Sequence, residues 1–263
     1  MNQKKICTAC GTQFPNLEQA PECCPICSDD RQYLPESGQT WTTLDDLSKN
    51  FKVMTQNLTD NLYEMKMTPH FAIGQRALLI VAPGGNILWD CIPLLDEPTI
   101  DFINSKGGLK AIAFSHPHFY STMGDWAEVF NCTIYIHQSD DQWIVQKTNR
   151  INLWSGMELK LWDNIKIINI GGHFPGSCIL HVPFLSAEGV IMCGDSFVIS
   201  PSKKHIAVMH SYPNKIPLPL NEINRIKERM RPLQFDTLYA WNSSQNICSE
   251  AKLLLEDSLA RYV

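Results

Sequence analysis

Short apolar runs alternate with amphipathic segments along most of the chain. The runs, which we expect to form β-strands, span residues 109–115, 132–137, 165–170, 177–182, 189–194 and 237–241, and a hairpin is expected over residues 76–91 around a Pro-Gly-Gly-Asn turn. Helical spacing or helix caps predict helices over residues 42–51, 99–108, 121–130, 140–147, 219–230 and 249–263. Strands interspersed with helices predict a layered α/β (α+β) domain with helices outside the sheets.

Composition limits the class of protein. The chain has 263 residues, of which 44% are hydrophobic and 19% charged, enough for one large core or for a core with a small appendage. Its net charge of -5 is mild and its Lys and Arg residues are scattered, so no nucleic-acid partner is expected. Neither a signal peptide nor an apolar run of about 20 residues is found, so we expect a cytoplasmic protein without membrane association.

Five of the ten cysteines crowd into residues 7–27. Cys7-x2-Cys10 and Cys24-x2-Cys27 are separated by thirteen residues, and two such CxxC turns can direct four thiolates at one tetrahedral zinc ion. A closed site of this kind leaves the metal no open position, so its role would be structural. The sequence therefore predicts a zinc ribbon over residues 1–40, followed by the main domain over residues 41–263.

Alternatives to this ribbon remain open from sequence. Cys23 could replace Cys24, although it gives x3 rather than x2 spacing. A disulfide conflicts with the cytoplasmic expectation, and a redox CxxC would be expected at a helix start after a strand, which the Pro- and Gly-rich surroundings do not offer. The five other cysteines are dispersed singly, mostly in or beside strand-like runs, as is typical of small buried residues.

Three apolar runs end in polar residues with metal-binding side chains. They are "AIAFSHPHFY" with His116 and His118, "INIGGHFPGS" with His173, and "VIMCGDSF" with Asp195. Side chains at strand ends project from a rigid edge, and positions i and i+2 can point the same way. Three imidazole nitrogens and one carboxylate oxygen make a ligand set suited to zinc, and also to iron or manganese.

The ordered set HxH, GGHFPGS and CGD resembles the signature of the metallo-β-lactamase superfamily. The intervals from His118 to His173 and from His173 to Asp195 are 55 and 22 residues, and the resemblance covers about residues 50–263. It implies a four-layer αββα sandwich, here carrying an N-terminal zinc ribbon. The superfamily includes thioesterases, lactonases, phosphodiesterases and β-lactamases, so the resemblance implies a metal-dependent hydrolase.

The chain departs from the family pattern at the second metal site. The family reads HxHxDH, whereas Tyr120 and Ser121 stand where Asp and His would be. The late His of the family should follow the final strand, where Trp241 and Asn242 stand instead. Carried over by position, the resemblance implies a mononuclear site of three His, with Asp195 in the bridging position.

Such a site supports a hydrolase of an ester, thioester, lactone or phosphodiester, in which metal-activated water is the nucleophile. Asp195 would serve as general base if it sits off the metal, and Tyr120 would donate a hydrogen bond to an oxyanion or leaving group. Two alternatives stay open: a non-catalytic descendant that serves as a binding scaffold, and a mononuclear iron or other redox enzyme. A small-molecule substrate is expected in the first case, and a homodimer is possible.

Four further features lie near this constellation in sequence. His210 is a candidate substitute ligand or base, or a surface-loop residue. His137 is expected to cap the following turn, and Asp125, two helical turns after His118, either faces solvent or the same cleft. The rigid segment "SYPNKIPLPL", with Tyr212, either lines a substrate pocket or is a structural crossover.

Overall fold

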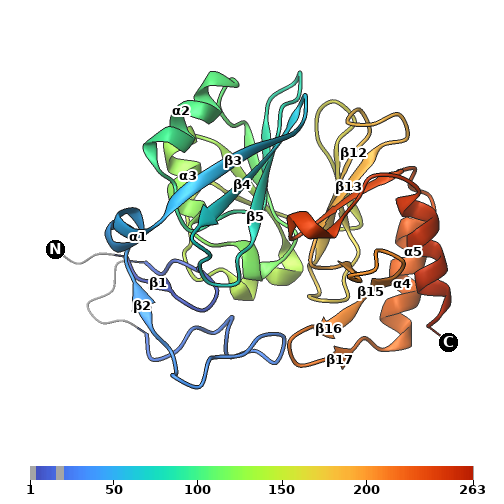
Figure 1. The fold of residues 1–263 in the computed structure, drawn as a ribbon, viewed down its shortest axis with the longest axis horizontal. Coiled ribbons are helices and arrows are strands. Elements are labelled where there is room, and N and C mark those ends of the chain that lie inside the picture. The colour runs from blue at the N-terminus through green and yellow to red at the C-terminus, as the bar shows by residue number, and fades with distance from the viewer. Residues whose placement is uncertain (1–3, 16–20, 263) are drawn as a thin grey trace.

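Two β-sheets face each other, and helices cover the outer face of each (Figure 1). This arrangement is seen in a computed structural model, which describes residues 4–15 and 21–262. None of the helices in these two ranges is long and apolar enough to cross a membrane.

The first sheet has the strand order β3-β4-β5-β6-β7-β8-β9. Its strands are β3 (Lys52–Thr59), β4 (Leu62–Thr68), β5 (Arg76–Ile80), β6 (Ile87–Trp89), β7 (Ala111–Ala113), β8 (Thr133–His137) and β9 (Ile151–Trp154). Pairing is antiparallel from β3 to β6 and parallel from β6 to β9. The predicted hairpin is confirmed, since β5 and β6 pair around the Pro-Gly-Gly-Asn turn.

The second sheet has the order β10-β11-β12-β13-β18-β19. Its strands are β10 (Glu158–Lys160), β11 (Lys166–Asn169), β12 (Cys178–Val182), β13 (Val190–Gly194), β18 (Thr237–Ala240) and β19 (Asn246–Ile247). All pairs are antiparallel except β13 with β18. The carboxyl ends of β7 and β13 thereby come to the edge where the metal-binding side chains lie.

The helices are α1 (Leu44–Asn50), α2 (Glu97–Ser105), α3 (Met123–Phe130), α4 (Leu220–Met230) and α5 (Ala251–Ala260). Short 3-10 helices are η1 (Pro117–Phe119), η2 (Gln138–Trp143) and η3 (Ser243–Gln245). Three two-stranded ladders complete the structure: β1 (Ile6–Cys7) with β2 (Trp41–Thr42), β14 (Val198–Ile199) with β15 (Ile206–Ala207), and β16 (Met209–Ser211) with β17 (Ile216–Pro217). In Figure 1, α2 and α3 lie beside the first sheet, and α4 and α5 beside the second.

Strand alternation separates the apolar side chains into three cores. In β11, Ile167 belongs to the core between the sheets and its neighbour Ile168 to the core under α4 and α5. In β5, Leu78 faces the other sheet and Leu79 the core under α2 and α3. Because successive strand residues point to opposite faces, each sheet is apolar on both sides, which requires four layers. The predicted αββα sandwich is confirmed.

One predicted helix is wrong and one hairpin was missed. Residues 140–147 do not form an α-helix; η2 ends at Trp143, because the Asp140 carboxylate accepts a hydrogen bond from Gly176 and the Trp143 ring packs edge-on against Phe174. Tertiary contacts outweigh helical spacing here. Sequence reasoning missed the hairpin of β3 and β4, since β3 lies at the sheet edge and none of its residues is buried.

The N-terminal segment packs against the rest of the chain. We call residues 4–15 and 21–42, which end with β2, the ribbon. The predicted ribbon, residues 1–40, also includes residues 1–3 and 16–20, which lie outside the described ranges. Its apolar side chains share a cluster with Trp143 and Val145 of the main domain. In Figure 1 the ribbon, in blue, runs along one end of the molecule from β1 and β2 toward β16 and β17.

Candidate metal centre

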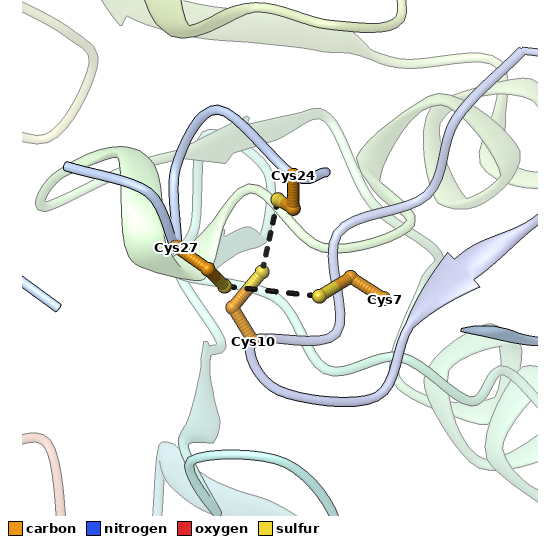
Figure 2. A group of neighbouring side chains, drawn as sticks. All are labelled: Cys7, Cys10, Cys24 and Cys27. Atoms are coloured by element: carbon orange, nitrogen blue, oxygen red, sulfur yellow. Dashed lines mark hydrogen bonds between the residues drawn. The ribbon is translucent and has the colours of Figure 1, made fainter. Parts of the chain in front are cut away.

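Four cysteine thiols of the ribbon converge on one point (Figure 2). The Sγ atoms of Cys7 and Cys27 lie 3.7 Å apart, and those of Cys10 and Cys24 lie 3.8 Å apart. All four ligand atoms lie within 4.8 Å of one another, and all four side chains are buried. Cys23 is exposed and outside the cluster, so Cys24 takes the fourth place.

This cluster has the features of a structural zinc site. The amide of Gly11 donates to the Cys7 carbonyl at 2.8 Å, forming the expected tight turn, in which Gly11 has a positive φ of 85°. Every cysteine in the described ranges is a free thiol, so the disulfide alternative finds no support there. Four buried thiols arranged at this spacing fit one tetrahedral metal ion and leave it no open position.

A second group brings His116, His118, His173 and Asp195 together. His116 follows β7, His118 lies in η1, His173 follows β11, and Asp195 follows β13. Asp195 Oδ1 lies 2.9 Å from His116 Nε2 and 3.6 Å from His173 Nε2. His173 Nε2 lies 3.4 Å from His118 Nδ1, so three nitrogens and one oxygen face a common point. The structure thus assembles all four residues proposed from sequence.

The environment of this group suits a cation. Burial lowers the pKa of His118 well below its usual value and that of His173 to about 4, so both rings are neutral, as a metal ligand must be. Burial opposes ionisation of Asp195, but the neighbouring histidines outweigh it and hold the pKa of Asp195 below its usual range. His116 Nε2 and Asp195 Oδ1 are buried and, although 2.9 Å apart, form no hydrogen bond with each other or with another group of the described structure. A metal ion shared by the four side chains accounts for both atoms.

Outer contacts fix two of the histidine rings. Ser115 Oγ lies 2.9 Å from His116 Nδ1 and donates to the Asp90 carboxylate at 2.8 Å. His173 Nδ1 lies 2.8 Å from the His210 carbonyl oxygen. Such contacts select the ring nitrogen that faces the metal. Sequence reasoning missed Asp90 and Ser115; the only signal was that Ser115 directly precedes His116 and that Asp90 follows another buried strand.

A cavity of about 540 Å³ opens over the group. Asp195 and His118 of the metal group line it, together with residues of the ribbon. Tyr212 and Pro213 also line it, so the segment "SYPNKIPLPL" lines a pocket, which was one of the two expectations for it. Trp241 lines it too, at the position where the resemblance would place a late His of the second metal site.

Tyr120 and Ser121 do not join the metal group. The Tyr120 ring is buried in the core under α2 and α3 and packs edge-on against Phe114, with ring centroids 5.1 Å apart. It is not among the described residues that line the cavity, so its position argues against the catalytic role predicted for it. Ser121 donates from Oγ to the Gly11 carbonyl at 3.3 Å, and its own carbonyl accepts from Gln13 at 3.0 Å. Ser121, at a position where the family pattern has a second-site ligand, therefore binds the ribbon instead.

The other candidate residues serve structural contacts. His210 Nε2 lies 2.8 Å from Asp30 Oδ1 of the ribbon and is not part of the metal group. His137 caps η2, accepting from the Ser139 amide at 3.3 Å, as predicted. Asp125 does not face the metal cavity; it is bound by Lys4 and by Gln13 of the ribbon.

Comparison with solved structures identifies the fold as that of the metallo-β-lactamases. DIM-1 metallo-β-lactamase matches with a TM-score of 0.59 and 13% identity, over 81% of this chain and 98% of its own. VMB-1 matches with a TM-score of 0.59 and 14% identity, over 80% and 95%. FIM-1 from Pseudomonas aeruginosa, in its mono-zinc form, matches with a TM-score of 0.55 and 12% identity, over 80% and 95%. At such identities the match defines the fold.

A closer relative defines the family. The uncharacterized protein YmaE of Bacillus subtilis (strain 168) is 41% identical over 262 residues, which cover 98% of this chain and 95% of YmaE. No family model matches the chain. The protein therefore belongs to the same family as YmaE, with a metallo-β-lactamase fold, a four-cysteine cluster and a buried three-histidine, one-aspartate group.

Proposed function

We propose that this protein is a metal-dependent hydrolase with one zinc ion in its active site and a second, structural zinc ion in its ribbon. The observation that carries the proposal is the convergence of His116, His118, His173 and Asp195 beside a cavity of about 540 Å³, which His118 and Asp195 line. A buried ligand set that is open to a cavity on one side distinguishes a catalytic metal site from a closed structural one. The mono-zinc form of FIM-1 supports the proposal that this fold can hold a single zinc ion.

When bound, a zinc ion at such a site acidifies a water molecule and polarises a carbonyl or phosphoryl group. The protein's own residues would orient the reactants. Asp195 lines the cavity, and with its lowered pKa it is ionised at neutral pH. A carboxylate with a low pKa is a weak base but a strong hydrogen-bond acceptor, so Asp195 would position the attacking water rather than store its proton.

The second metal site of the family is replaced by protein contacts, which favours the mononuclear form. Ser121 binds the ribbon, the Tyr120 ring lies in the core, and Trp241 lines the cavity. Within residues 4–15 and 21–262, only two groups of His, Cys, Asp or Glu side chains are arranged to hold a metal, and we propose one ion for each. Because metal-activated water attacks carbonyl and phosphoryl groups, we propose a small-molecule ester, thioester, lactone or phosphodiester as the substrate.

Elemental analysis combined with an activity panel tests the proposal. Protein purified without added metal should contain two zinc ions per chain, and His116→Ala should contain one and lose turnover of whichever of the four substrate classes the wild type hydrolyses. His205→Ala, which changes an exposed histidine, is the matched control and should keep both ions. One metal ion per chain in both wild type and His116→Ala would sink the proposal, and iron in place of zinc would favour a redox enzyme.

A further inference from the structure

The ribbon joins the two halves of the sandwich at the edge that carries the metal group. On the first half, the Gln13 side chain donates to Asp125 at 2.7 Å. On the second half, Asn214 Nδ2 donates to the carbonyls of Asp30 and Gln32 at 2.9 and 3.0 Å. The ribbon is therefore attached to both halves, and residues of the ribbon and of both halves line the cavity.

Residues of the ribbon form part of the cavity lining itself. Gln32, Tyr33 and Pro35 line it together with His118 and Asp195 of the metal group. Tyr33 is 59% exposed and belongs to none of the apolar cores of the described residues. Because Tyr33 also lines the cavity, its side chain is available to a ligand there.

The side chains that line the cavity are mostly uncharged. Apart from Asp195 and the histidines, the described side chains that line the cavity are uncharged, and neither Lys nor Arg is among them. Ile73, Val198 and Trp241 add apolar surface to the lining. Sites for phosphate groups usually add Arg or Lys to the metal, whereas an apolar, neutral wall favours a neutral ligand with an apolar group.

We propose that the ribbon is a wall of the substrate pocket and that Tyr33 contacts the apolar group of a neutral acyl substrate. The inference rests on the proposed hydrolase function and narrows its substrate class to carboxylic esters, thioesters or lactones with an apolar acyl group. The four-cysteine site then has a consequence for specificity: by fixing the fold of the ribbon, it fixes the position of Tyr33 over the cavity.

Binding of two non-hydrolysable ligands tests the role of Tyr33 without turnover. Acetohydroxamate and octanohydroxamate share the metal-binding group and differ in apolar length, and their affinities are measured by calorimetry. Octanohydroxamate should bind the wild type more tightly. Tyr33→Ala should weaken octanohydroxamate about tenfold, because the ligand loses an aromatic contact surface, and acetohydroxamate less than about twofold. Phe184→Ala, which removes another exposed aromatic ring that is not part of the cavity lining, should change neither.

Three results would overturn the inference: equal affinities of the two hydroxamates for the wild type, an unchanged preference in Tyr33→Ala, or tighter binding of octylphosphonate than of octanohydroxamate. The last would mean that the pocket favours an anion. Failure of the hydrolase proposal has a different signature, in which the hydroxamates bind as expected but no ester, thioester or lactone is turned over.

Discussion

Arg31 of the ribbon donates from Nε to the backbone carbonyl of His173, at 2.5 Å, while its guanidinium lies over the Phe174 ring, 4.6 Å from the centroid. His173 is one of the three histidines of the metal group, and Arg31 lies only four residues after Cys27 of the cysteine cluster. A single side chain therefore links the two predicted metal sites. A change in the ribbon can therefore reach the histidine group although the two groups share no ligand.

Arg31→Ala should weaken metal binding by the histidine group and leave the cysteine group intact. Removing a contact that orients a ligand typically costs about 10- to 100-fold in metal affinity. Cobalt(II) titration separates the two sites, because only the cysteine site gives thiolate charge-transfer absorbance. Arg150→Ala, which removes an ion pair between Arg150 and the exposed Glu128, is the control and should change neither site. Equal affinities in wild type and Arg31→Ala would show that Arg31 does not position His173.

Cys24→Ser should remove one metal ion per chain, whereas Cys23→Ser should remove none. Cys24 is buried within the four-cysteine cluster and Cys23 is exposed outside it. Because a short segment of this kind depends on its metal for folding, limited proteolysis should cut Cys24→Ser within residues 4–42 much faster than wild type. Loss of metal in Cys23→Ser instead would mean that the x3 spacing is the one used.

The main layers and the metal ligands could be predicted because their signals are local. An apolar run followed by His116 or Asp195 predicts both a strand and a metal-binding residue at its end. The spacing of the CxxC pairs predicts the cysteine cluster. Contacts between distant segments give no such local signal in the sequence. Asp90 reaches Ser115 only because β6 and β7 are neighbours in the sheet, and the sequence does not state that pairing.

Tyr120 shows that a residue's position in a family motif does not determine where its side chain lies. It stands where the family pattern has a metal ligand, which suggested a role in catalysis. The structure places its ring in the core instead, with Phe114. The direction of one side chain after η1 depends on tertiary packing, and residue identity alone does not determine it. The same holds for the ribbon, whose cavity-facing residues Gln32 and Tyr33 have no sequence signature.

Glu64→Gln should destabilise the fold strongly. Glu64 and Arg76 form an ion pair of 2.8 Å in which both side chains are almost fully buried, and Arg76 also donates to the Ala240 carbonyl of the second sheet at 2.8 Å. Removing one charge leaves the guanidinium buried with incomplete compensation, at a cost of about 3–5 kcal/mol. Urea unfolding measures the free energy. Glu158→Gln, which removes a more exposed acid paired with Lys160 and Lys166, should cost about 1 kcal/mol or less.

Asp140→Asn should make the protein more stable than wild type at high pH and about equal at low pH. Asp140 is buried beside the loop that carries His173, and burial raises the pKa of its carboxyl to about 7 from 3.8. The folded state therefore holds this proton more tightly than the unfolded state, so the stability that protonated Asp140 provides is complete below pH 3.8 and is lost as the pH rises toward 7. Asn is neutral at every pH and keeps an oxygen that can accept from the Gly176 amide, a bond of 2.7 Å in the wild type.

The difference in unfolding free energy between Asp140→Asn and wild type should therefore grow from pH 5 to pH 8, by an amount on the order of 2 kcal/mol. Taking the difference between two proteins cancels the titration of the histidines, which both share. Asp141→Asn, at the neighbouring position on η2, controls for the loss of a negative charge. If the difference stayed constant across this range, Asp140 would be ionised throughout, and its hydrogen bond to Gly176 would offset the cost of burying the charge.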